Sequence, residues 1–121
     1  MQDFTNLKVW QRSHALTLAV YRDTRAFPKD EQYALTSQIR RAAVSVPANV
    51  AEGCGTDGNA DFARFLQMSM RSASELQYHL LLARDLGYLD ATAQVALDDL
   101  IQEVKRMLAS LIGKVRSARS H

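Results

Sequence analysis

The chain has 121 residues, with 15 lysines and arginines against 13 aspartates and glutamates, and a formal net charge of +2 at pH 7. This length fits one domain, residues 1–121, and the 47% hydrophobic content argues against wholesale disorder. The single cysteine, Cys54, excludes an internal disulfide and favours a reducing cytoplasm. The longest uncharged apolar-rich stretch, residues 42–51, is far shorter than the roughly 20 residues that span a bilayer, and the charged N-terminal segment argues against a signal peptide.

The first predicted helix covers about residues 6–26, with Thr5 or Asn6 as its N-cap. Trp10 lies beside the apolar stripe of this helix, so we predict that it is a core or interface anchor; stacking on a nucleic-acid base is the alternative. The stripe itself contains Val9, Leu16, Val20 and Phe27.

The second predicted helix covers about residues 31–53, with Asp30 as its N-cap. Pro47 falls inside its apolar pattern, lacks the N–H that would bond the Ala43 carbonyl, and costs about 3 kcal/mol in a helix interior. Either the helix stops near Val46 or it continues past a kink. The helix-compatible residues that follow favour the kink, with the helix ending at Gly53. The apolar face is formed by Leu35, Ile39, Ala42, Val46 and Val50.

The third predicted helix covers about residues 60–86 and has the most regular pattern. We expect Asp57 or Asn59 to cap its start and Gly87 to end it. Phe65 and Tyr78 fall outside its seam and are predicted to contact another subunit. The seam steps by four and three residues, which is typical of left-handed packing at about 20°; it consists of Phe62, Leu66, Ser69, Ala73, Leu76, Leu80 and Ala83.

The fourth predicted helix covers about residues 91–115 and follows Asp90, which we expect to start it. Two overlapping apolar stripes run along it, and burial on two sides is what a subunit interface requires. The stripes are Ala93, Leu97, Leu100, Val104, Met107, Leu111 and, beside it, Leu97, Ile101, Val104, Leu108, Leu111, Val115. Four such helices with short loops predict an all-α, up-down-up-down antiparallel four-helix bundle whose second helix is kinked at Pro47.

The run QIRRAAVSVPANVAEG, residues 38–53, resembles the signature of the four-helix bundle protein family. This family is also called the 23S rRNA-intervening-sequence protein family and includes the accessory protein of diversity-generating retroelements. Flanking segments agree, among them LKVWQRS at 7–13 and SASELQYHL at 72–80, while Arg71 departs from the glycine expected there. The resemblance implies a homo-oligomer, pentameric in characterised relatives, with a basic surface, no established enzymatic activity and a partner such as a reverse transcriptase.

Residue sets that would carry catalysis or bind a metal are weak. The Glu-x-x-His pairs of di-iron bundles do not occur, and Glu75 and His79, four residues apart, are also an ordinary surface pair. Cys54 is predicted to be an inert thiol, because the negative end of the helix dipole disfavours the thiolate. We therefore expect no catalytic residues, no metal and no cofactor.

Two polar residues, Asn49 and Glu52, follow Pro47 near the end of the second predicted helix. We interpret both as structural residues that cap the helix end or pair with Arg40 or Arg41. A catalytic role is the weaker interpretation.

Basic residues gather in two places. Arg40 and Arg41 are the only charged residues between positions 32 and 51, and they point about 100° apart on a helix. After Glu103 the chain contains no acid and five cations: Lys105, Arg106, Lys114, Arg116 and Arg119. Either these residues form a solvated or intersubunit-paired surface, or they bind phosphate, and five copies of a +2 chain would repeat them around a total charge of +10.

Three functions follow as expectations. The first is a non-enzymatic homo-oligomeric adaptor that binds RNA or DNA through phosphate contacts from Arg40, Arg41 and the five cations after Glu103. The alternative is a protein–protein scaffold without nucleic-acid binding, which works through apolar grooves between subunits. A metal-dependent or hydrolytic enzyme ranks last.

Overall fold

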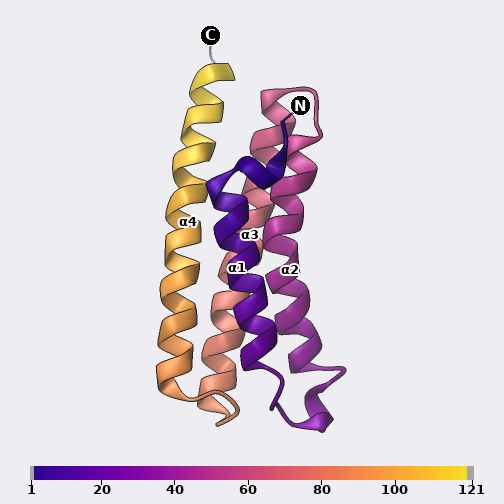
Figure 1. Cartoon of the computed structure of the whole chain (residues 1–121), viewed down its shortest axis with the longest axis vertical. Helices are drawn as coiled ribbons and strands as arrows, with labels where there is room; N and C mark the ends of the chain where they lie inside the picture. The colour runs from indigo at the N-terminus through magenta and orange to yellow at the C-terminus, as the bar shows by residue number, and fades with distance from the viewer. Residues whose placement is uncertain (1, 120–121) are drawn as a thin grey trace.

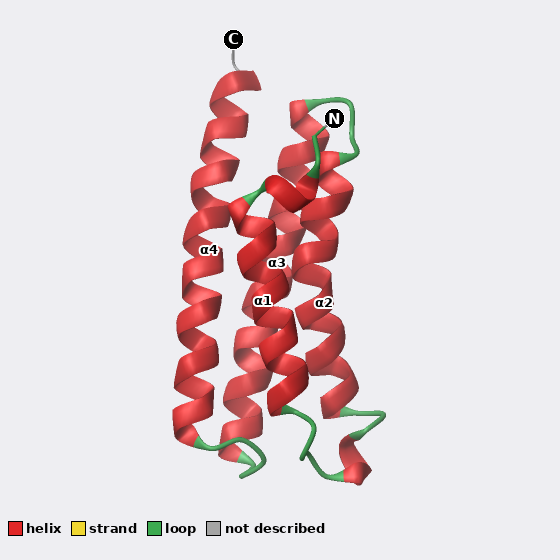
Figure 2. Cartoon of the chain, in the orientation of Figure 1, coloured by secondary structure: helices red, strands yellow, loops and turns green. Residues whose placement is uncertain are grey.

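The computed structural model (Figure 1) describes the backbone of residues 2–119 and the side chains of residues 2–118. Every regular element in this range is helical (Figure 2). The long helices are α1 (Lys8–Asp23), α2 (Leu35–Cys54), α3 (Asn59–Asp85) and α4 (Ala91–Arg119), with short 3-10 helices η1 (Phe4–Asn6) and η2 (Lys29–Glu31).

The four long helices form a ring in chain order. α1 packs against α2 and α4, and α3 packs against the same two helices. Consecutive helices run in opposite directions, with α1 descending and α4 ascending in the view of Figure 1. This arrangement confirms the predicted all-α, up-down-up-down four-helix bundle.

The core follows the predicted seams. All seven predicted seam positions of α3 are buried, as are the predicted α1 stripe and every α2 position except the half-buried Leu35. The two α4 stripes separate: one faces the core and the other is only half-buried. The core side contains Leu97, Ile101, Val104, Leu108, Ile112 and Val115, and the half-buried side contains Ala93, Leu100, Met107 and Leu111.

The first predicted helix is too long at both ends. Asp3 Oδ1 accepts a hydrogen bond from the Thr5 N–H at 3.0 Å and caps the separate helix η1. Extended Leu7 then precedes α1, so neither Thr5 nor Asn6 is its cap. α1 ends at Asp23, three residues before the predicted end at 26.

The predicted start of the second helix is also wrong. Asp30 lies in η2, and α2 begins only at Leu35, after Ala34, which offers no side-chain cap. A Glu31 carboxylate oxygen instead accepts a hydrogen bond from the Leu35 N–H at 3.3 Å. Glu31 therefore accepts this hydrogen bond from the turn that precedes α2, and it is not itself the first residue of the helix.

α2 continues through Pro47, as predicted, and ends at Cys54, one residue past the predicted end. The carbonyl of Ala43, which loses its usual partner to the proline, lies 3.0 Å from Thr17 Oγ1 of α1. The same hydroxyl lies 2.9 Å from the Ser13 carbonyl, so it can donate its one proton to either. A neighbouring helix thus replaces the hydrogen bond that the proline removes.

The start of α3 differs from the prediction, whereas its end agrees. Gly58 precedes Asn59 at the start, so neither Asp57 nor Asn59 is the cap. Gly87, at φ +82°, follows the end of α3, a backbone conformation that glycine adopts without strain.

Asp90 starts α4 as predicted, because its carboxylate accepts a hydrogen bond from the Ala93 N–H at 2.7 Å. α4 then continues to Arg119, past the predicted end at 115. Within residues 2–119 no helix combines the length and apolarity needed to cross a bilayer.

Candidate nucleic-acid interface

The two polar residues after Pro47 differ: Asn49 belongs to the packing between α2 and α3, and Glu52 does not. The buried Asn49 amide donates to the Ser45 carbonyl at 2.8 Å and lies 2.9 Å from the Ser45 hydroxyl, which is itself 2.7 Å from the Ser72 hydroxyl. Glu52 is exposed, and within the described side chains it forms no ion pair with Arg40 or Arg41. The predicted pairing of Asn49 and Glu52 with these arginines is therefore wrong, while the structural role of Asn49 agrees with its contacts.

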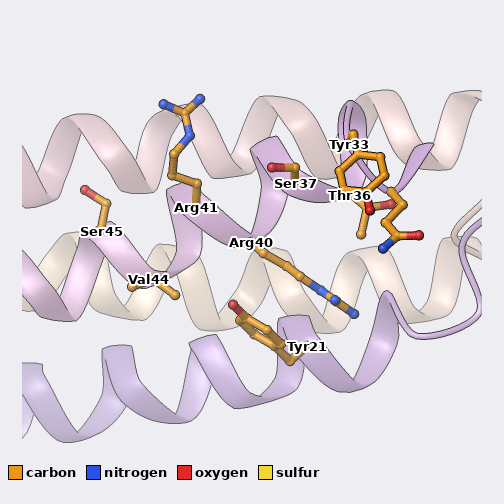
Figure 3. A pocket seen from close by; sticks show the side chains of 9 residues that line it. Tyr21, Tyr33, Thr36, Ser37, Arg40, Arg41, Val44 and Ser45 are labelled. Carbon is orange, nitrogen blue, oxygen red and sulfur yellow. The ribbon is translucent and has the colours of Figure 1, made fainter. Parts of the chain in front are cut away.

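Arg40 and Arg41 lie on the outer surface of α2 and point in different directions (Figure 3). The Arg40 guanidinium lies over the Tyr21 ring, 4.7 Å from its centre, and its Nε donates to Thr24 Oγ1 at 3.0 Å. Arg41 extends away from α1 and donates to Gln38 of its own helix. No carboxylate of the described residues forms an ion pair with either arginine. Their charge is therefore not neutralised by a carboxylate within residues 2–118.

Both arginines line a groove of about 610 Å³ on the α1–α2 side of the bundle. We call it the α1–α2 groove. It is lined by Tyr21, Gln32, Tyr33, Thr36, Ser37, Arg40, Arg41, Val44 and Ser45. Arg40 and Arg41 are its only charged residues, so the groove carries positive charge.

The cations of α4 divide between the two sides of that helix. Lys105 lies against α3, where its Nζ donates to Gln77 Oε1 at 3.3 Å. Arg106 and Lys114 line a groove of about 370 Å³ on the α1 side. Arg116 lines another, of about 270 Å³, on the α3 side. The side chain of Arg119, the remaining predicted contact, lies outside the described residues.

Three further cations that sequence reasoning missed join these grooves. Lys8 of α1 lines the first, together with Arg106 and Lys114, and Arg64 and Arg71 of α3 line the second, together with Arg116. No acid lines either groove, although Arg64 also pairs with Asp61 at 3.5 Å. The seven-residue spacing of Arg64 and Arg71 was a signal that they share a face. We call the six residues the α4 basic surface: Lys8, Arg64, Arg71, Arg106, Lys114 and Arg116.

The three predicted aromatic anchors differ in burial. Trp10 is half-buried; its ring stacks on His14 at 4.9 Å and meets the edge of Phe4 at 5.1 Å, so it packs within its own chain. Phe65 is also half-buried. Tyr78 is 60% exposed and is the most exposed of the three.

The groups that the sequence offered for catalysis or metal binding lie apart in the described part of the chain. Cys54 is buried, and this burial raises the pKa of its thiol, which disfavours the reactive thiolate. His79 Nε2 and Glu75 Oε2 lie 3.8 Å apart as a pair within one helix. Among the described residues, no three His, Cys, Asp or Glu side chains are grouped so that they could hold a metal ion.

Comparisons with known proteins place the chain in a family. The sequence profile of the 23S rRNA-intervening sequence protein family matches residues 5–110. A solved structure of a protein with unknown function, from the S23 ribosomal protein family of Bacteroides thetaiotaomicron, superposes with a TM-score of 0.78. That alignment has 24% sequence identity and covers 86% of this chain and 97% of the other, so it shows a shared fold. No curated protein matches the chain. Because the profile spans most of its length, the chain belongs to the 23S rRNA-intervening sequence protein family.

Proposed function

We propose that this protein is a non-enzymatic, homo-oligomeric adaptor that binds the phosphate backbone of nucleic acid, RNA in the first instance, through the α4 basic surface. The observation that carries the proposal is the pair of acid-free grooves on either side of α4, each lined by three cations from two helices. A polyanion that crosses α4 would meet both grooves. Its phosphates would release counterions as they bind, which favours association at low salt.

The residues of this surface suit backbone binding rather than base reading. Four of the six are arginines, whose planar guanidinium groups donate two hydrogen bonds to one phosphate. No element of the bundle supplies the base-contacting motifs of sequence-specific modules. We therefore expect affinity that depends on salt and length more than on sequence.

Association of several copies would multiply this weak charge. One side of the subunit contact is expected where Tyr78, Leu81 and Val95 leave apolar side chains exposed on α3 and α4. Five copies, the number that the family resemblance implies, would present five such basic surfaces and convert weak contacts into polyvalent binding.

The test is RNA binding by fluorescence anisotropy across a salt series, with the oligomeric mass measured on the same samples. The double variant Arg106→Ala, Lys114→Ala should weaken single-stranded RNA binding and reduce the slope of log K against log salt by about 1.4 per bound chain. Arg22→Ala is a matched control, since Arg22 is an exposed cation that pairs with Asp23 at the opposite end of α1. Wild-type protein that binds no RNA at low salt would overturn the proposal.

A second candidate function is a scaffold that binds only protein, and the exposed apolar residues favour it. Tyr78, at 60% exposure, and Val95, at 54%, would then contact a different chain, such as a reverse transcriptase, rather than a copy. The double variant Tyr78→Glu, Val95→Glu distinguishes contact with a second copy from contact with a different protein. A smaller mass in solution supports homo-oligomer contact there, whereas an unchanged mass with loss of a protein partner supports the scaffold.

A further inference from the structure

The α1–α2 groove combines an exposed aromatic ring with arginines, and this combination differs from the α4 basic surface. Tyr33 lies in the turn between η2 and α2 and is 89% exposed. Its ring has no aromatic or hydrogen-bonding contact with another described side chain. A ring in this position has a free face on which a planar group can stack.

The arginines of the groove are held in different ways, and both offer donors. Arg40 is held in place by Thr24 and by the Tyr21 ring, so little side-chain entropy is lost when its guanidinium binds a ligand. Arg41 donates a hydrogen bond to Gln38 of its own helix, and it points to the side of α2 away from Tyr21. One groove therefore carries two positively charged side chains that point to different sides of α2, and Tyr33 lies at the end of the groove where α2 begins (Figure 3).

A polar group without a partner adds an independent observation. Thr36 is 6% exposed and lines the groove, and its hydroxyl oxygen has no hydrogen-bond partner among the described residues. Ser37 lines the groove next to it. Buried polar atoms are usually paired, so this hydroxyl, which is itself closed to solvent, is a hydrogen-bonding group that a rotation of the Thr36 side chain would offer to a polar ligand atom in the groove.

We propose that the α1–α2 groove binds one unpaired nucleotide of a single-stranded nucleic acid, with its base stacked on Tyr33 and its phosphate at Arg41. This inference rests on the proposed function and deepens it, because it names single strands as the preferred ligand. The groove volume of about 610 Å³ lies within the roughly 300–1,000 Å³ of small-ligand sites.

Stacking explains why the preference is for single strands. In a duplex both faces of each base are covered by neighbouring base pairs, so Tyr33 has no face to meet. An unpaired base presents its face, whatever its sequence. The α4 basic surface, which contacts phosphates, serves either form. The two surfaces adjoin α1 near Lys8 and Tyr21, about 20 Å apart along that helix and on different sides of it, so a strand that crosses α1 would meet both.

The experiment compares fluorescein-labelled single-stranded RNA with a blunt duplex of the same sequence, by anisotropy on the full chain. Tyr33→Ala should weaken single-strand binding by about 5-fold to 150-fold, with the duplex affinity and the salt slope unchanged. Tyr33→Phe keeps the ring and should bind as wild type, whereas Tyr33→Leu keeps apolar bulk without the ring and should behave as Tyr33→Ala. Arg41→Ala should reduce the single-strand salt slope by about 0.7.

Photocrosslinking identifies the contact directly. Single-stranded RNA that contains 5-bromouridine should crosslink to the tryptic peptide of residues 30–40, whose only aromatic residue is Tyr33. The peptide of residues 13–22, which contains Tyr21, is the internal comparison. Crosslinks confined to peptides of α4 would contradict the proposal.

The outcomes separate this inference from the proposed function. Equal affinity for single strands and duplex, unaffected by Tyr33→Ala, contradicts nucleotide binding in the α1–α2 groove but not phosphate binding by the α4 basic surface. A Tyr33→Ala variant that changes the oligomeric mass instead overturns it too, because a second copy would then cover the groove. Wild-type protein that binds no RNA overturns both. Since Tyr33 is almost fully exposed, its loss is not expected to unfold the chain.

Discussion

α2 and α4 occupy opposite corners of the bundle and do not pack against each other within residues 2–119. Two backbone carbonyls of α2 are satisfied from neighbouring helices: Thr17 reaches the Ala43 carbonyl, and Ser69 donates to the Val46 carbonyl at 2.7 Å. The cations along the outer side of α4 instead line grooves without acids. The comparison contrasts backbone carbonyls that are satisfied by a neighbouring helix with cations that line grooves without acids.

α2 and α4 also differ in how closely their glycines are packed, and substitution of these glycines gives the largest expected effect on stability. A Cβ on Gly53 of α2 would lie 2.9 Å from Phe62 Cδ1 and 3.0 Å from Phe65 Cβ, whereas a Cβ on Gly113 of α4 would meet nothing within 4 Å. Gly53→Ala should therefore lower the free energy of unfolding by about 2 kcal/mol. Gly113→Ala should raise it by about 0.5–1 kcal/mol, because alanine favours the helix. Urea denaturation of both variants measures this difference, and stabilisation by Gly53→Ala would show that α2 and α3 are not so closely packed.

A smaller effect is expected where Pro47 interrupts the hydrogen bonds of α2. Thr17→Val keeps the side-chain shape but leaves the buried Ala43 carbonyl without its donor, at a cost of about 1 kcal/mol. Pro47→Ala restores an N–H that can reach the same carbonyl. In that background Thr17→Val should cost less, and a double-mutant cycle by chemical denaturation measures the difference. Additive costs would mean that the Thr17 hydroxyl donates its hydrogen bond to the Ser13 carbonyl alone.

The sequence predicted the parts of this fold that repeat within one helix. The α3 seam could be read directly, because its steps of four and three place residues on one face whatever packs there. The start of α2 could not, since Glu31 bonds the Leu35 N–H across a turn. Nor could Lys8, Arg64 and Arg71 be assigned to the candidate interface, because they join the α4 cations only once the helices are arranged in space.

The smallest expected effect lies at the border of the α4 basic surface, where the last acid of the chain is paired. Arg12 Nε donates to Glu103 Oε1 at 2.8 Å between α1 and α4, and both side chains are substantially exposed. Hydrogen bonding from Arg12 lowers the pKa of Glu103. The pair therefore contributes to stability above the ordinary glutamate pKa of about 4.3, and this contribution is lost as pH falls through the lowered value.

An NMR titration should place the Glu103 carboxyl below the ordinary range in the wild type and within it in Arg12→Gln, with little change in stability at pH 7 for so exposed a pair. Glu103→Gln tests whether the cationic surface beside α4 can be extended to Arg12. It removes the carboxylate that neutralises Arg12 within the described residues, and Arg12 should then strengthen RNA binding by about twofold or more at low salt and steepen its salt dependence. If this variant binds RNA as the wild type does, Arg12 lies outside the path of the strand, and the binding surface ends at the grooves beside α4.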